Sequence, residues 1–145
     1  MLVGLANDDA DRYDGKHLIE FGSDEYQTLL TGFLDELRGI AGRHGATLTL
    51  IALPPKSGRF VGPDDQGGWR ELQFAQLQKT YAATHAGVQW LDLSDQICPA
   101  GDCDHPAAGF EPSWRYDGEH YDGNGARWVA AWLADQLDQL DPTPS

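Results

Sequence analysis

The sequence has little positive charge, little sulfur and no long apolar run. Its 145 residues carry 10 Lys and Arg against 23 Asp and Glu, a formal net charge of −13. Without a basic stripe to replace counterions on phosphates, nucleic acids and anionic membrane surfaces are excluded as partners. No apolar run approaches the length of a membrane span, and the first residues lack the basic and apolar regions of a signal peptide. We therefore expect no membrane segment in this chain.

What remains is the composition of an ordinary globular domain. Hydrophobic residues make up 41% of the chain, which argues against wholesale disorder, and five Trp supply large apolar area. The length fits one domain. We assign residues 1–140 to it and residues 141–145 to a frayed tail.

Apolar patterning predicts strands and helices in alternation. Buried strands are expected over 1–6, 46–53 and 88–93, with loops over 7–22 and 56–68 and an irregular segment over 94–115. Ser23 caps a helix that ends at Gly45, a second helix covers 69–85, and Asp122 caps a third. The apolar positions predicted to face the core of the last helix are Ala126, Val129, Ala130, Leu133, Leu137 and Leu140.

This alternation is typical of an α/β fold with a parallel sheet and helices on both faces. Three parallel strands make a small sheet, and strands buried on both faces need full cover. The sequence therefore predicts that a partner completes the sheet, as in a homodimer, or that an N-terminal part of the domain is missing.

The strongest chemical motif is Asp117-Gly-Glu-His120, directly before the last helix. An Asp and a His three residues apart on a tight turn can face one site, where the Asp orients the imidazole and the His acts as general base. The alternative is an ordinary Asp-Gly turn with a surface His.

The stretch from Trp114 to Leu133 resembles the last conserved block of the SGNH (GDSL-type) hydrolases. Further landmarks make the chain similar to the SGNH domains fused to bacterial membrane acyltransferases: residues 21–23, residues 48–55, residues 90–94 and residues 97–99. The resemblance implies a three-layer, flavodoxin-like fold with five parallel strands, of which this chain would hold the last three. Its first two strands would lie upstream, and the chain would be the C-terminal part of the domain.

The resemblance also implies a Ser-His-Asp triad in which Asp117 and His120 are two members. The Gly-Asp-Ser block that carries the nucleophile is absent from this sequence, and Ser23 is better explained as a helix cap. Asn7 is similar to the family's oxyanion Asn, although two residues, where one is usual, separate it from Gly4. Its alternative is an ordinary loop Asn after a strand.

The implied function is hydrolysis or transfer of O-acyl groups on glycans or similar esters, without a cofactor, by a chain that is inactive alone. The alternative is a non-catalytic accessory or interaction module that associates through an open sheet edge. The fused relatives face outside the cell, which implies an extracytoplasmic location.

Cys98 and Cys103 bracket a turn-rich loop, and a disulfide between them is the favoured interpretation. Free thiols come second. A metal site with His105 comes last, because structural zinc usually needs four Cys or His ligands. We therefore predict no metal. The segment Arg12-Tyr-Asp-Gly-Lys-His17 has the same residue pattern as the Asp117 turn. We interpret it as a coincidence or as a loop at the rim of the site.

Overall fold

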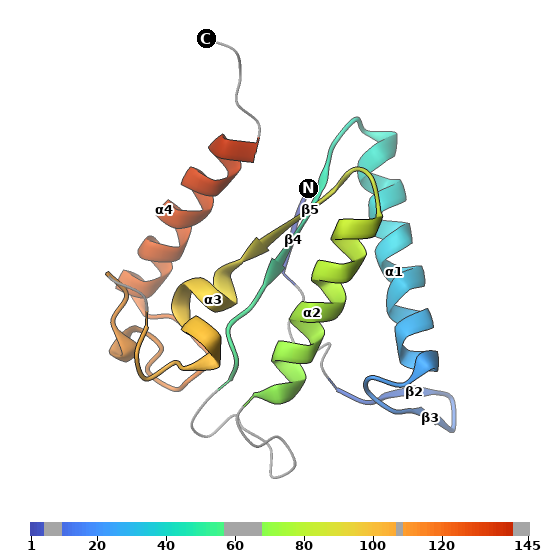
Figure 1. Cartoon of the computed structure of the whole chain (residues 1–145), viewed down its shortest axis with the longest axis horizontal. Helices are drawn as coiled ribbons and strands as arrows, with labels where there is room; N and C mark the ends of the chain where they lie inside the picture. The colour runs from blue at the N-terminus through green and yellow to red at the C-terminus, as the bar shows by residue number, and fades with distance from the viewer. Residues whose placement is uncertain (5–9, 57–67, 107–108, 141–145) are drawn as a thin grey trace.

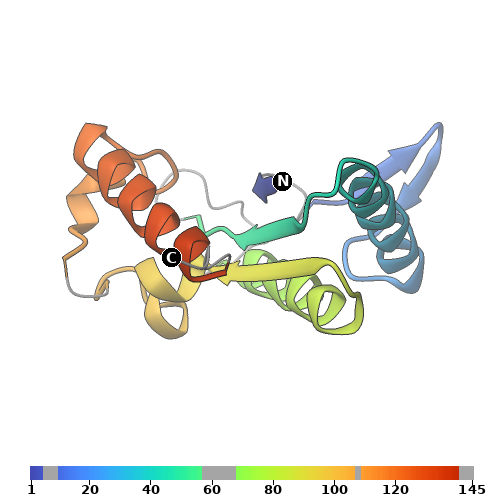
Figure 2. The same ribbon diagram turned by 90° about the horizontal axis from the view of Figure 1, so that it is seen from above.

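The structure is a computed structural model that describes residues 1–4, 10–56, 68–106 and 109–140. Its centre is a parallel sheet of three strands in the order β1-β4-β5, formed by Leu2–Gly4, Leu48–Ala52 and Val88–Asp92. Helices α1 (Asp24–Arg43) and α2 (Trp69–Thr84) lie on one side of the sheet, and α3 (Leu93–Ile97) and α4 (Gly123–Leu140) on the other (Figures 1 and 2). The predicted α/β class and the parallel sheet are confirmed.

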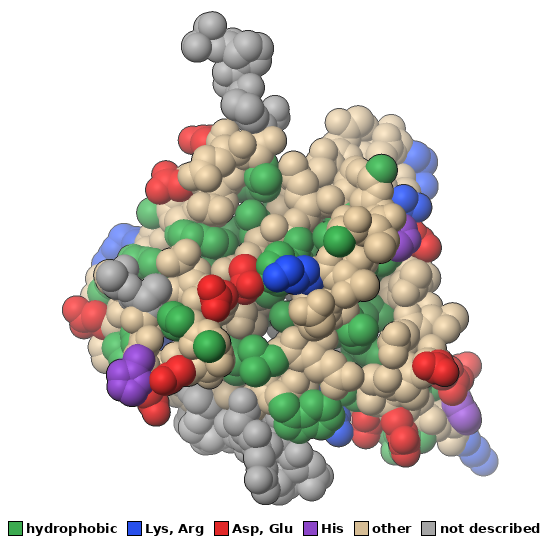
Figure 3. Space-filling view, in the orientation of Figure 1, with side chains coloured by type: hydrophobic (Ala, Val, Ile, Leu, Met, Phe, Trp, Pro, Cys, Tyr) green, Lys and Arg blue, Asp and Glu red, His purple; other side chains and the backbone are tan. Residues whose placement is uncertain are grey.

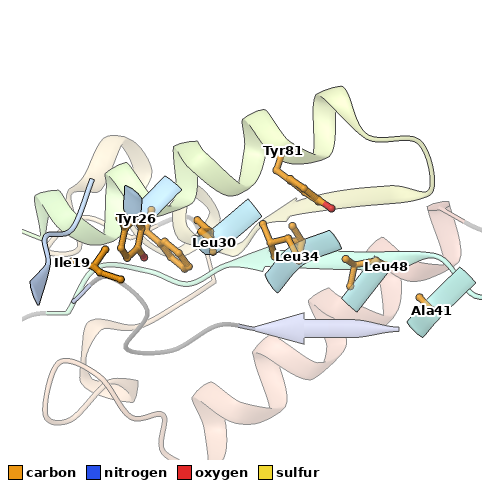
Figure 4. Packing of buried hydrophobic residues seen from close by; sticks show 9 residues of the cluster. Ile19, Tyr26, Leu30, Leu34, Ala41, Leu48 and Tyr81 are labelled. Atoms are coloured by element: carbon orange, nitrogen blue, oxygen red, sulfur yellow. The ribbon is translucent and has the colours of Figure 1, made fainter. Parts of the chain in front are cut away.

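The side chains of β4 alternate between two cores because successive residues of a strand point to opposite faces. Leu48 and Leu50 pack with α1 and α2, while Ile51 packs with α3 and α4. The first core runs between α1, α2 and β4 as a row of apolar side chains (Figure 4). Truncating its wholly buried Leu34 to Ala would cost about 2–5 kcal/mol.

Helix α1 begins and ends as the sequence predicts. The Ser23 hydroxyl accepts a hydrogen bond from the Tyr26 amide at 3.1 Å, and Asp24 and Glu25 occupy the first turn, where the helix dipole favours negative charge. Beyond the last turn, Gly45 adopts a positive φ of 65°, which a residue without a side chain accepts readily.

The prediction of a loop over 7–22 is wrong for its second half. Strands β2 (Arg12–Asp14) and β3 (His17–Ile19) form an antiparallel hairpin, in which Asp14 lies opposite His17. The Asp-Gly turn signal was present, but the flanking residues are too polar to show a strand pattern. Only Ile19 of the hairpin reaches the core.

The 94–115 segment is also more regular than predicted. It contains α3 and two short 3₁₀ turns, η2 (Pro99–Gly101) and η3 (Pro112–Trp114). Asp92 begins α3, because its side chain accepts a hydrogen bond from the Asp95 amide at 2.8 Å. Helices this short leave almost no periodicity in a sequence.

Helix α4 is capped by Asp122 as predicted, but of the six residues predicted to face the core only Val129 and Leu133 pack against it. The Asp122 carboxylate accepts hydrogen bonds from the Asn124 and Gly125 amides, both at 2.8 Å. Gly125 is buried, whereas Ala126 and Ala130 are exposed. The residues that pack against the second core are Trp128, Val129, Trp132 and Leu133. Tryptophan buries far more apolar area than alanine, and this decides the rotation of the helix.

Strand β1 is an edge of the sheet, and its side chains are more exposed than those of the buried strand that the sequence predicts. It pairs with β4 alone among the described residues, and Leu2 and Gly4 are exposed. Val3, which points to the opposite face from its neighbours, packs against the core of α1 and α2. The open side of β1 therefore presents backbone groups on which a further strand could pair.

Candidate functional site

The segment Arg115–His120 is a tight turn between η3 and α4. The Gly118 amide donates to the Arg115 carbonyl at 2.8 Å, and Gly118 itself is buried with a φ of 89°. Any other residue at this position would be strained by the positive φ, and its side chain would have to fit into buried surroundings. The Asp-Gly pair of the sequence is thus needed to turn the chain here.

The turn brings Asp117 and His120 together. His120 Nδ1 lies 2.9 Å from Asp117 Oδ2, while Asp117 Oδ1 accepts hydrogen bonds from the His120 amide at 2.8 Å and the Glu119 amide at 3.0 Å. The Asp117 side chain is only 4% exposed, whereas that of His120 is 60% exposed. The Asp117 carboxylate is held inside the turn, whereas the His120 imidazole is exposed at the surface.

The hydrogen bonds keep Asp117 ionised. Burial by itself raises the pKa of a carboxyl group, but the backbone amide of His120, its imidazole and the Glu119 amide all favour the charged form. Together they outweigh burial and hold the pKa of Asp117 well below its ordinary value. An ionised carboxylate can only accept, so Nδ1 of a neutral His120 carries the ring proton and Nε2 keeps its lone pair.

Arg115 connects this turn to the rest of the fold. Its Nη2 donates to the Gly118 carbonyl at 2.5 Å and to the Pro55 carbonyl at 2.9 Å, and Nη1 lies 3.8 and 3.7 Å from the sulfurs of Cys98 and Cys103. Burial lowers the pKa of the guanidinium, which stays charged because arginine titrates so high. A hydrogen bond from a charged donor contributes about 1.5–3 kcal/mol.

Pro55 lies just past the carboxyl end of β4, so Arg115 fixes the turn at that end of the sheet. In open parallel sheets, ligands bind beyond the carboxyl ends of the strands. The loops there carry side chains whose orientation the sheet does not constrain. The exposed imidazole of His120 is therefore placed where this class of fold usually binds its ligands.

Two other Asp-x-x-His segments provide an internal comparison. The hairpin places Asp14 opposite His17, but the His17 ring contacts Glu25, with 2.9 Å between Nε2 and Oε2. That contact raises the pKa of His17. His17 is held by a surface contact to α1 and not by the Asp of its own motif.

Asp102 and His105 form a closer copy of the pair. Their side chains are also 2.9 Å apart, and the Asp102 carboxylate accepts a hydrogen bond from the Asp104 amide at 3.0 Å. The difference is exposure, since the Asp102 side chain is 54% exposed. The distance alone thus does not distinguish Asp117 and His120. The buried acid and the link through Arg115 do.

The sequence-predicted residues are placed as follows. Asp117 and His120 lie together, and Cys98 and Cys103 are joined by a disulfide with an S–S distance of 2.08 Å, next to Arg115. Asn7 lies outside the described residues. Arg115 is part of the motif, but the sequence alone assigns it no role, because its sequence neighbours do not reveal that it is buried.

The described residues provide no observation that supports a metal site or a membrane-spanning helix. In the described ranges, no three His, Cys, Asp or Glu side chains are grouped as metal ligands. None of the described helices is long and apolar enough to cross a bilayer. Among the described side chains on the face in Figure 3, Lys and Arg form no continuous patch.

A scan against protein-family models and a search of curated proteins found no match to this chain.

Proposed function

We propose that the chain is the C-terminal part of an SGNH-type hydrolase or acyltransferase that acts on O-acyl esters of glycans or similar substrates. The observation that carries the proposal is the Asp117–His120 pair, with a buried, ionised acid and an exposed imidazole. The proposed fold is the flavodoxin-like one, in which β1, β4 and β5 would be the third, fourth and fifth strands. Within the described ranges β1 pairs with β4 on one side only, which supports this, since a first strand would pair on the other side.

In the proposed reaction, His120 first acts as general base. A serine hydroxyl attacks the ester carbonyl and gives its proton to Nε2 of His120, while Asp117 stabilises the imidazolium that forms. The tetrahedral intermediate collapses when His120 returns the proton to the departing alkoxide. Water or an acceptor hydroxyl then attacks the acyl-enzyme and gives its proton to His120, which passes it to the serine oxygen as the acyl–oxygen bond breaks. Asn7 and backbone amides would hold the oxyanion.

In the proposed fold, the nucleophile would follow the first strand, in a Gly-Asp-Ser block that this sequence does not contain. Of the described serines, Ser23 caps α1 and Ser94 is buried in α3, while Ser113 is exposed in η3. Ser57 and Ser145 lie outside the described residues. Because the sequence contains no Gly-Asp-Ser block, the chain is proposed to be inactive alone.

The test begins with the DNA upstream of the Met1 codon and the hydrolysis of p-nitrophenyl acetate. We expect an in-frame strand ending in Gly-Asp-Ser. The protein that includes it should hydrolyse the ester, with turnover lost in both His120→Ala and the Ser variant. His105→Ala, which removes the exposed copy of the pair, is the matched control and should retain activity. Activity that survives His120→Ala would overturn the proposal.

The chain described here is the second arm of the same test. It should show no turnover above that of free imidazole at equal concentration. Turnover that disappears in His120→Ala but persists in His105→Ala would show that this chain contains its own nucleophile.

The alternative function is an accessory module that associates through β1. The observation in its favour is the unpaired side of this strand among the described residues, with Leu2 exposed. In that case the Asp117–His120 pair would stabilise the turn and carry no chemistry. The activity of the longer protein decides between the two.

A further inference from the structure

Arg115 contacts three segments that are distant in the sequence. The guanidinium reaches the Gly118 carbonyl in the turn, the Pro55 carbonyl after β4, and the sulfurs of Cys98 and Cys103. Cys98 is wholly buried and Arg115 nearly so. In the part of the chain that the structure describes, Arg115 has no carboxylate partner within ion-pair distance. The groups that it contacts directly are carbonyl oxygens and sulfur, while the carboxylates of Glu119, Asp117 and Glu71 act on its charge from farther away.

The bond to Gly118 acts directly on the hydrogen bonds of Asp117. The Gly118 carbonyl and the Glu119 amide belong to one peptide unit, which is planar. When Arg115 fixes the direction of that carbonyl, it also fixes the direction of the Glu119 N–H, which donates to Asp117 Oδ1 at 3.0 Å. The guanidinium thus determines how the carboxylate that holds His120 is oriented.

The disulfide determines where the guanidinium can lie. Nη1 of Arg115 rests against both sulfurs, and the S–S bond holds them together on one side of the guanidinium. Two thiols do not stay at bonding distance. In a close-packed interior, their separation must shift the group that packs on both of them.

We propose that Arg115 is the positioning residue of the Asp117–His120 pair and that the Cys98–Cys103 disulfide keeps its guanidinium in place. The catalytic meaning of this role rests on the proposed function, because it assumes that His120 acts as a base. The geometric part does not depend on it. Reduction of the disulfide would then weaken the hold of Asp117 on His120.

The reduction is a thiol–disulfide exchange with a dithiol. A thiolate of the reductant attacks Sγ of Cys103, the less buried of the two cysteines, and the electron pair of the broken S–S bond stays on Cys98. The second thiolate of the reductant attacks the mixed disulfide and releases Cys103. Both cysteines take protons from water, and the dithiol ends as a cyclic disulfide. Arg115 lies beside the leaving Cys98 sulfur, where its charge stabilises the thiolate.

The experiment reads the nitrogen chemical shifts of the imidazoles by NMR in the whole chain. In the oxidised wild type we expect the Nδ1–H form of neutral His120. Arg115→Lys keeps the charge but loses the planar fork that reaches two carbonyls and the sulfurs. We expect a mixture of ring forms and hydrogen exchange at the Glu119 amide faster by about tenfold.

Arg127→Lys is the matched control, because Arg127 is an exposed residue of α4 whose Nη2 donates to Asn124 Oδ1. It should leave His120 unchanged. If Arg115 only supports the fold, Arg115→Lys will lower the melting temperature and leave the His120 ring form and the Glu119 exchange rate as in the wild type. That result would overturn the proposal.

The second arm of the experiment is dithiothreitol treatment of the wild-type protein. It does not depend on whether a variant folds. Reduction should give the same changes at His120 and Glu119, while His17, which contacts Glu25 in the distant hairpin, keeps its signal. An unchanged His120 in the reduced protein would contradict the role of the disulfide. Neither arm measures ester hydrolysis. If hydrolysis by the longer protein survives His120→Ala, the proposed function fails while these results stand.

Discussion

Asp117 and His120 form a pair in which the acid is buried and the base is exposed. Asp102 and His105 have the same spacing and the same 2.9 Å separation, but there both side chains are exposed. The chain therefore contains a site candidate and its own control. Substitutions at the two positions separate the effect of an Asp–His contact from the effect of the surroundings.

Asp117→Asn should reverse the ring form of His120 without unfolding the turn. The Asn oxygen can still accept the Glu119 and His120 amides, but its NH₂ group now faces Nδ1, which must accept. We expect neutral His120 to change from the Nδ1–H to the Nε2–H form, as read from the nitrogen shifts. Asp102→Asn should affect His105 and leave His120 as it is. A His120 that keeps Nδ1–H in Asp117→Asn would contradict the assigned geometry.

The stabilisation from Asp117 should disappear in acid. Its pKa is lowered in the folded state, and in the unfolded chain it returns to about 3.9. The folded state thus binds fewer protons between the two values. The contribution of Asp117 is complete above about pH 5 and is lost as the pH falls through the lower, folded-state pKa.

Urea unfolding of the wild type and Asp117→Asn at several pH values measures this contribution. The difference in the free energy of unfolding should be largest near neutral pH and should shrink steadily in acid. Any decrease in the free energy of unfolding that occurs equally in both proteins comes from the protonation of other carboxylates. A difference that stays constant with pH would contradict the lowered pKa.

Gly125→Ala should separate α4 from the turn. A Cβ at this position would lie 3.0 Å from Trp114 Cβ and 3.1 Å from the Trp114 carbonyl oxygen, and the latter cannot move without shifting η3. Overpacking of this kind costs about 1–3 kcal/mol. Thermal unfolding measures the cost.

Gly32→Ala is the control for that variant. Gly32 is exposed in α1, and nothing lies within 4 Å of a Cβ built on it. Alanine there should stabilise the protein by about 0.5–1 kcal/mol, because glycine is a poor helix former. If both substitutions changed the melting temperature equally, α4 would have room for a methyl group next to Trp114.

The edge of β1 predicts self-association at high concentration. Leu2 is 42% exposed on this strand, and Leu2→Lys should shift the protein toward monomer in analytical ultracentrifugation, because a charged edge resists pairing. Leu29→Lys replaces a leucine of α1 that is 48% exposed and has no free strand edge beside it. It should leave association unchanged. Dissociation by Leu29→Lys alone would locate the contact on α1.

The sequence by itself determined the order of the main elements, since long apolar patterns and helix caps act locally. Ser23, Gly45 and Asp122 predicted helix boundaries because each meets backbone groups that are close to it in the chain. The β2–β3 hairpin and α3 were missed because they are short. The packed face of α4 is predicted only in part: Val129 and Leu133 pack as expected, but periodicity counts apolar positions without their size, and Trp128 and Trp132 outweigh the alanines.

The candidate site divides in the same way. The pairing of Asp117 with His120 could be predicted because a three-residue turn brings them together. Only the tertiary structure decided that this Asp is buried while Asp102, in an equal motif, is exposed. The role of Arg115 was also beyond the sequence, since its partners Pro55 and Cys98 are 60 and 17 residues away. Burial and long-range contacts depend on how the elements pack, and a local pattern contains no record of that packing.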